Sequence, residues 1–255
     1  LAILGVLIVG GVAALLLTAP DTLAGSRGLT VGNVNLFPEV SEMKHGRFVE
    51  ELEGAKSARV ELDLGPLHTT VRELDDSPNL IEAELDYAGE IRFSASGDAE
   101  RRIALSEESS NWRWPLNLDG KRYKWEIGLA QDMPLDLYVD ASSGSSELNL
   151  SRLTLKRFEM DASSGSATVD LPGGEYSVAY DGSSGSVKFN APTEADVQMN
   201  LSMSSGSVQV NVDEGADCDL RLTHASSGSL IVRAPRDAGL RVEVRHHSSG
   251  RVVTP

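Results

Sequence analysis

Apolar and polar residues alternate on both sides of a short corner sequence that recurs along the second half of the chain. After one corner the apolar positions are Val187, Phe189 and Ala191, and before another they include Leu135 and Leu137. An alternation with a period of two places one side of a segment in a core and the other in solvent, which is typical of β-strands. Each repeat is therefore predicted to contain a strand, a tight corner and a second strand.

The corner reads Ser-Ser-Gly-Ser in five copies and Ser-Ser-Gly-Arg in a sixth, and successive corner glycines are 21, 20, 21, 22 and 22 residues apart. A nearly constant period of about 20 residues is typical of a solenoid. We therefore predict an all-β fold, a parallel β-solenoid with coils of about 21 residues and regular coils over residues 131–255. The predicted structural corners are Gly144, Gly165, Gly185, Gly206, Gly228 and Gly250.

The corner composition has a structural and a functional interpretation. Glycine accepts a positive φ angle, and the serines beside it can bond to the corner backbone and to equivalent serines of the next coil. The alternative is a polar serine ridge that binds a ligand, and we favour the structural interpretation. In the last two coils the apolar alternation before the corner slips by one residue, which predicts a β-bulge there.

Residues 57–130 fit the repeat less closely and are predicted to form an N-terminal coil and a β-meander cap. Gly65 is the candidate corner of that first coil. Further along, Asp119-Gly120 separates two aromatic segments and predicts a hairpin. Its aromatic residues Trp112, Trp114 and Trp125 form either an interaction surface or, as we favour, a plug that closes the end of the solenoid.

The chain begins with an apolar run, and residues 1–17 contain no charged side chain. At about 1.5 Å per residue this run approaches the thickness of a bilayer core, so residues 1–20 are predicted to form one transmembrane helix. A cleaved secretory signal is the alternative. Residues 21–56 are then a juxtamembrane connector, and the solenoid is expected on the extracytoplasmic side of the membrane.

Composition and charge exclude several classes of function. The formal net charge of −15 argues against nucleic acid as a partner. Cys218 is the single cysteine, so neither an internal disulfide nor a cysteine-based zinc site is expected. The sequence contains no nucleotide-binding loop, nucleophile elbow or zinc-ligand spacing, and we expect neither an enzyme nor a cofactor.

Two sets of titratable residues recur at one position of the repeat, four residues before a corner glycine. Asp140, Asp161 and Asp181 occupy it in three consecutive coils, where a cation such as Ca²⁺ is possible but solvated carboxylates are favoured. His224 and His246 occupy it in the last two coils and form a possible interaction surface. We expect them to be neighbours that bind no metal and that repel each other when protonated.

Several segments resemble a known family. Residues 53–65, which read EGAKSARVELDLG, resemble the opening of toast-rack domains, and residues 134–137 and 148–153 resemble their repeats. The resemblance spans about residues 50–255 and extends to adhesin-like β-solenoids and to the C-terminal domain of LiaF-like cell-envelope stress regulators. It implies a bacterial, membrane-attached domain that senses or scaffolds at the envelope, without a catalytic motif.

Two functional hypotheses follow. The first is a membrane-anchored envelope sensor, regulator or binding module that engages a protein partner through one exposed strip. The second is a structural surface protein, either adhesin-like or a subunit that assembles with copies of itself. The sequence does not identify a small-molecule ligand.

Overall fold

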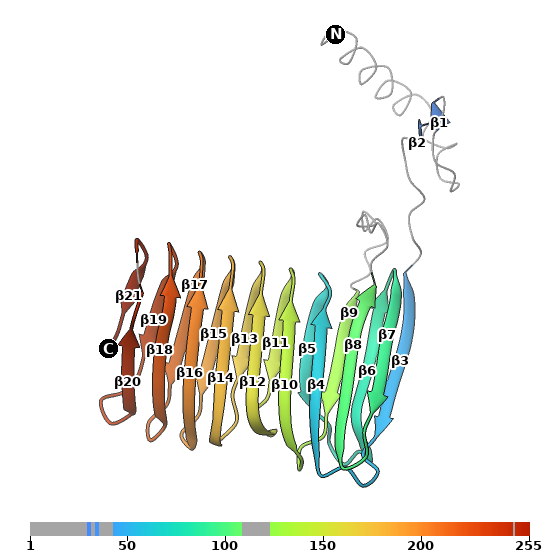
Figure 1. The fold of residues 1–255 in the computed structure, drawn as a ribbon, viewed down its shortest axis with the longest axis horizontal. Coiled ribbons are helices and arrows are strands. Elements are labelled where there is room, and N and C mark those ends of the chain that lie inside the picture. The colour runs from blue at the N-terminus through green and yellow to red at the C-terminus, as the bar shows by residue number, and fades with distance from the viewer. Residues whose placement is uncertain (1–29, 32–33, 36–42, 109–122, 247) are drawn as a thin grey trace. The chain divides into compact units, whose positions relative to one another are not determined.

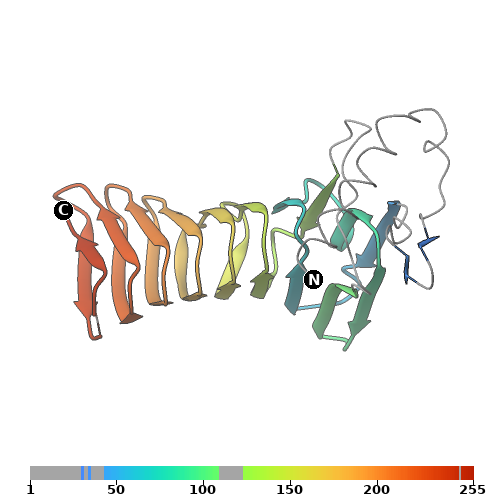
Figure 2. The same cartoon turned by 90° about the horizontal axis from the view of Figure 1, so that it is seen from above.

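The computed structural model describes residues 30–31, 34–35, 43–108, 123–246 and 248–255, which fall into two units. In the first unit, strands β1 (Thr30–Val31) and β2 (Val34–Asn35) pair antiparallel. The second unit contains all the other strands, arranged in two sheets that face each other (Figures 1 and 2).

Each sheet is built mainly from strands of successive coils. The nine-stranded sheet has the order β20 (Gly239–Val244), β18 (Asp217–Ala225), β16 (Ala195–Met203), β14 (Gly174–Gly182), β12 (Thr154–Ala162), β10 (Pro134–Ala141), β4 (Ser57–Leu64), β8 (Glu100–Glu108) and β7 (Glu90–Ser96). The ten-stranded sheet has the order β21 (Arg251–Val253), β19 (Ser229–Arg233), β17 (Ser207–Val212), β15 (Ser186–Ala191), β13 (Ser166–Asp170), β11 (Ser145–Asn149), β5 (His68–Glu73), β9 (Lys124–Leu129), β6 (Asn79–Tyr87) and β3 (Lys44–Glu51).

The regular coils confirm the predicted parallel solenoid. From β10 to β21 the chain alternates between the sheets, and each strand pairs in parallel with the equivalent strand of the next coil. Ser166 pairs with Ser186, for example, and Ser186 pairs with Ser207. The backbone groups of one coil are therefore satisfied by its two neighbours, which is why the coils stack.

The N-terminal half differs from the prediction in its order in space. The coil of β4 and β5 lies directly beside the coil of β10 and β11, although 60 residues separate the two in the chain. Strands β8 and β9 form a further parallel coil on the other side of β4 and β5. The predicted meander is thus divided between the two sheets, with β6 and β7 added antiparallel to β9 and β8.

Strand β3 lies within the segment that we assigned to the connector. It is the edge strand of the ten-stranded sheet and pairs antiparallel with β6. Two contacts across the sheets hold its inward side: the rings of Phe48 and Phe93 are 5.8 Å apart, and Arg101 forms a 3.1 Å ion pair with Glu50. Both partners of that ion pair are largely shielded from solvent, and the solenoid unit therefore begins before residue 56.

The core lies between the sheets and consists of the inward side of each strand. Phe189 and Leu201 are fully buried, and the ring of Tyr180 packs edge-on against Phe189 at 5.8 Å between centroids. Burial of such side chains contributes about 1.5–3 kcal/mol each. The alternation read from the sequence identified these positions because the two sides of every strand differ in solvent exposure.

The corner glycines lie in one line along the stack. An added Cβ atom on Gly165, Gly185 or Gly206 would lie 2.3–2.5 Å from the carbonyl oxygen of the preceding corner glycine. These three glycines and Gly144 have φ angles between 101° and 111°, as the corner prediction required. Serine hydroxyls add bonds between coils, since Ser184 Oγ donates to the Ser163 carbonyl and Ser205 Oγ to the Ser183 carbonyl.

The last two corners use glycine for a different reason. Gly228 and Gly250 are not among the glycines with positive φ, but an added Cβ would lie 2.6 Å from Met203 Sδ in the first case and 2.0 Å from the Gly228 carbonyl oxygen in the second. Thr223 is the extra residue of the first 22-residue coil, because the register between β16 and β18 shifts there. Its Oγ1 donates to the Leu201 carbonyl at 3.0 Å, so the predicted bulge is present in β18.

A row of aspartates runs along the outer side of the nine-stranded sheet. Asp63, Asp140, Asp161 and Asp181 are in register on β4, β10, β12 and β14. Partial burial and the neighbouring carboxylates Asp181, Asp140 and Glu159 raise the pKa of Asp161, and burial together with Asp140 and Glu107 raises that of Asp63. The ionised row therefore opposes folding.

The described residues include no helix long and apolar enough to span a membrane. The predicted helix at 1–20 and the predicted hairpin around Asp119-Gly120, with Trp112 and Trp114, lie outside the residues that the structure describes.

The substitution Gly185→Val tests the close approach of neighbouring coils. It combines a φ angle of 110° with a Cβ position 2.5 Å from Gly165 O, whereas Gly174, with φ 100°, has no atom within 4 Å of an added Cβ. We expect Gly174→Val to lose about 1–2 kcal/mol through backbone strain alone and Gly185→Val to lose more. Urea unfolding of both variants measures the difference, and equal losses would contradict the role assigned to coil contact.

The substitution Asp161→Asn tests the aspartate row. Because its folded-state pKa is raised, the folded protein binds this proton more tightly than the unfolded chain, and stability falls as pH rises through the carboxyl range. We expect the variant to be more stable than the parent at pH 7, with an advantage that shrinks toward pH 4. Asp213→Asn, in an exposed turn, is the control, and a destabilised Asp161→Asn at pH 7 would refute the repulsion.

Candidate functional site

A groove of about 410 Å³ crosses the outer side of the nine-stranded sheet at strands β8, β4, β10 and β12. Ala104 and Ser106 of β8 contribute short side chains to its wall, and longer side chains on β4, β10 and β12 rise beside them. The hollow thus arises where the displaced coil of β8 and β9 packs beside β4 and β5. Its position follows from the nonsequential order of the N-terminal coils.

An aromatic ring held between two cations forms one side of the groove. The Arg59 guanidinium lies 4.1 Å from the centroid of the Tyr138 ring, and that of Arg157 lies 5.9 Å from it. Each arginine is also paired with a glutamate two residues further on, Arg59 with Glu61 at 2.8 Å and Arg157 with Glu159. These contacts fix the ring and neutralise both guanidinium groups.

The aspartates of the groove have no such cation. Asp63, Asp140 and Asp161 line it, and within the described residues no ion pair to any of them is found. The groove therefore combines a fixed aromatic ring with excess negative charge. An arrangement of this kind suits a ligand that carries both a cationic group and an apolar or planar part.

The sequence analysis missed Asp63, although a signal for it was present. Leu64 pairs with Ala141 and Thr69 pairs with Ser146, so Leu67 occupies the position of the corner glycine and Gly65 lies two residues earlier. Taking Gly65 as the corner gave the correct inward positions but shifted the coil by two residues. With Leu67 as the corner, Asp63 stands four residues before it, as the other aspartates do.

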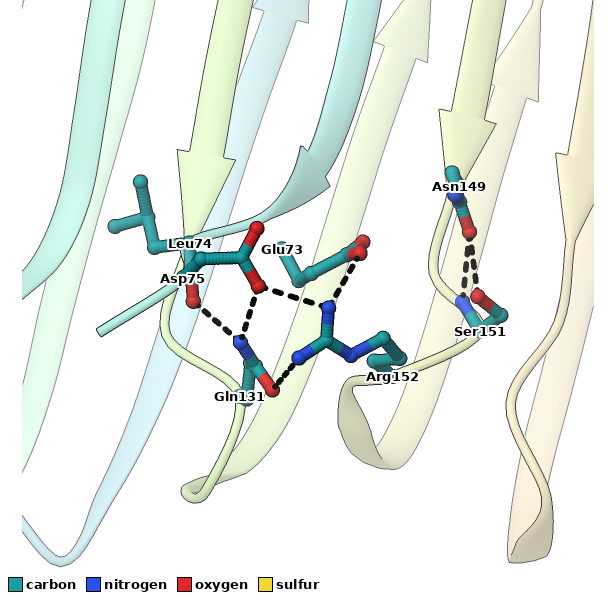
Figure 3. A network of polar contacts seen from close by, with 7 residues as sticks. All are labelled: Glu73, Leu74, Asp75, Gln131, Asn149, Ser151 and Arg152. Carbon is teal, nitrogen blue, oxygen red and sulfur yellow. Dashed lines mark hydrogen bonds and ion pairs between the residues drawn. The ribbon is translucent and has the colours of Figure 1, made fainter. Parts of the chain in front are cut away.

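A second hollow, of about 180 Å³, lies among Leu52 and the connections β5–β6, β9–β10 and β11–β12. Gln131 and Arg152 line it and belong to the network of polar contacts that Figure 3 shows. Arg152 forms ion pairs of 2.8 Å with Asp75 and 3.3 Å with Glu73, and its Nη2 donates to Gln131 Oε1 at 3.0 Å. The charge of this arginine is thus already balanced. The network joins the connections β5–β6, β9–β10 and β11–β12, and we interpret it as a structural tie for the chain segment that crosses from β9 to β10.

The remaining sequence candidates lie elsewhere. Trp125 has 0% exposure, and its Nε1 donates to the Asp86 carbonyl, so it packs in the core and is not available as an interaction surface. His224 and His246 are exposed in the last two coils, where the Ala225 amide donates to the His246 carbonyl at 2.9 Å. The segment that carries His246, just after β20, therefore lies beside β18, and His224 Nε2 lies 2.9 Å from Ser226 Oγ.

The part of the chain that the structure describes shows neither a cluster of metal ligands nor a reactive thiol. No group of three or more histidine, cysteine, aspartate or glutamate side chains there is placed to hold a metal ion. Cys218 is fully buried, and burial with Asp217 and Asp196 raises its pKa to about 11. Its thiol consequently stays protonated at neutral pH and packs as an apolar side chain.

Comparison with solved structures gives chains of low identity. A candidate cell adhesion protein from Clostridium sporogenes is 14% identical, with a TM-score of 0.48, over 81% of this chain and all of its own. A candidate adhesin from Bacteroides fragilis is 10% identical, with a TM-score of 0.42, over 83% and 96% of the two chains. A candidate lipid-binding protein from Parabacteroides distasonis is 10% identical, with a TM-score of 0.35, over 83% and 97%.

A search of curated proteins gave no match. The sequence profile of the N-terminal domain of toast_rack, DUF2154, matches residues 39–190, which is more than half of the chain and includes every strand that lines the groove. The profile and the stacked coils agree, and the chain belongs to the toast-rack family.

Proposed function

We propose that this chain is a binding module of the cell envelope, held at the membrane by residues 1–20, whose groove on the nine-stranded sheet engages a cationic segment of a partner protein. The observation that carries the proposal is the groove itself, where the fixed Tyr138 ring lies beside aspartates without a cation. The activity proposed is recognition, with no chemical step.

The position of the groove supports binding of an extended segment. Its lining comes from four adjacent strands of a rigid sheet, so the shape is formed before a partner arrives. A lysine or arginine side chain placed over the aspartate row would relieve the repulsion among these carboxylates. Binding would therefore stabilise the fold as well as the complex.

The anchoring part of the proposal rests on the apolar run at residues 1–17, which is long enough to approach the span of a bilayer core. Placement of the solenoid outside the cytoplasm is consistent with a chain that has one buried cysteine and a strongly negative surface. The alternative is a scaffold that assembles with copies of itself. A scaffold would form oligomers in solution, whereas a binding module would need its groove carboxylates to retain a different protein.

Membrane fractionation tests the anchor. In bacteria that express the full chain, we expect it in the membrane fraction, resistant to high salt and released by detergent, and digested by protease added to intact spheroplasts. A variant that lacks residues 1–20 should be found in the soluble fraction. Recovery of the full chain in the soluble fraction, or its protection from the added protease, would refute this part of the proposal.

Affinity capture from solubilised membranes tests the groove. The double variant Asp140→Asn/Asp161→Asn removes two groove carboxylates, and Asp196→Asn/Asp217→Asn removes two from the same sheet outside the groove. We expect the first to lose at least one protein that the parent and the control both retain, with a loss of about tenfold in affinity. Identical protein profiles would contradict the proposal, and sedimentation showing concentration-dependent oligomers with an unchanged profile would favour the scaffold.

A further inference from the structure

The outer side of the ten-stranded sheet carries an array in which most side chains are uncharged and polar, namely serine, threonine, asparagine and glutamine. Over the five strands β11, β13, β15, β17 and β19, pairing in register places outward residues in three rows. The first row contains Ser145, Ser166, Ser186, Ser207 and Ser229, the second Glu147, Thr168, Lys188, Gln209 and Ile231, and the third Asn149, Asp170, Asn190, Asn211 and Arg233.

Hydrogen bonds between coils fix this array. Asn211 Nδ2 donates to Asn190 Oδ1 at 2.7 Å, and Asn190 Nδ2 donates to Asp170 Oδ1 at 2.6 Å. Gln209 Nε2 joins the row by donating to Asn211 Oδ1 at 2.8 Å, and Ser229 Oγ donates to Ser207 Oγ at 3.1 Å. These six side chains are therefore ordered before any ligand binds, which lowers the entropy cost of binding.

The array is electrically neutral on a strongly acidic chain. Its five strands contain two acidic and two basic residues. The five strands of the same coils in the nine-stranded sheet contain nine acidic and three basic residues. The partner suited to the array is therefore uncharged, because a polyanion or polycation would gain no net attraction there.

The spacing of the array suits a polymer better than a small molecule. Neighbouring strands are about 4.8 Å apart and outward residues along one strand about 6.7 Å apart, so hydroxyl and carboxamide groups repeat in two directions. The groove on the nine-stranded sheet and the hollow beside Arg152 lie outside the three rows. A ligand must consequently lie flat on this side and make the same contacts several times.

A second copy of the chain fits this side less well. Five strands of about 17 Å present roughly 400 Å², about half of what each partner contributes to a stable protein interface. A polymer is under no such limit, because a repeating chain can rebind at adjacent sites without diffusing away.

We infer that the outer side of the ten-stranded sheet over β11–β19 binds an uncharged polysaccharide. Hydroxyl groups of sugars both donate and accept hydrogen bonds, as serine, threonine, asparagine and glutamine side chains do. The site is separate from the groove of the proposed function, since the two lie on different sheets.

Co-sedimentation of the full chain with insoluble cellulose and with chitin tests the inference. We expect the parent chain to bind at least one polymer, and to bind it equally at about 0.05 and 0.5 M salt, because neutral contacts are not screened. The double variant Thr168→Glu/Gln209→Glu should weaken binding by about tenfold or more. The matched control Gln198→Glu/Asn200→Glu places the same charges outward on β16 in the other sheet and should bind as the parent does.

Each other outcome overturns the inference. If the parent chain binds neither polymer, and thermal melting shows that it is folded, the inference is wrong. Equal losses in the two double variants, or binding abolished by salt, would assign the effect to net charge. A parent dimer that Thr168→Glu/Gln209→Glu dissociates would assign this side to a second copy, whereas loss of polymer binding in Asp140→Asn/Asp161→Asn would place the polymer in the groove.

Discussion

The structure depends on one constraint, the parallel hydrogen bonding of each coil to the next at a register that the corner maintains. Amides of the corner serines donate to carbonyls of the preceding coil that lie one corner position earlier, as Ser184 does to Ser163 and Ser205 to Ser183. An added Cβ atom on Gly165, Gly185 or Gly206 would lie 2.3–2.5 Å from the carbonyl oxygen of the preceding corner glycine, so a larger residue at any of these three positions would push two coils apart. The recurrence of the corner sequence is thus required by the stacking itself.

The same register turns a repeated residue type into a continuous row on the surface. Asparagines in consecutive coils donate and accept along their row and so strengthen the stack. Aspartates in consecutive coils repel one another, and partial burial together with the neighbouring carboxylates Asp181 and Asp140 raises the pKa of Asp161. Stability therefore explains the asparagine row but not the aspartate row, and the cationic partner that we propose would supply the positive charge that the aspartates lack.

The fold of the regular coils was predictable from sequence because both signals, the period of the corners and the alternation of the strands, are local. The order of the N-terminal coils was not, since β4 pairs with β10 across a long intervening segment and no local pattern encodes that choice. Taking Gly65 as the corner hid Asp63, and so one member of the groove. Trp125 was ambiguous because an aromatic side chain suits a plug as well as a surface, and only its burial in the core between the sheets decides between them.

The two outer sides face away from each other because the inward side of every coil strand is occupied by the shared core. The two proposed sites lie on opposite sides of two sheets that pack about 10 Å apart, so a ligand at one site would not need to displace a ligand at the other. The two outer sides also differ in charge. An anionic surface would be repelled more strongly by the acidic strands of the nine-stranded sheet than by strands β11–β19, whose acidic and basic residues balance, so this charge difference would favour an approach with β11–β19 facing the surface.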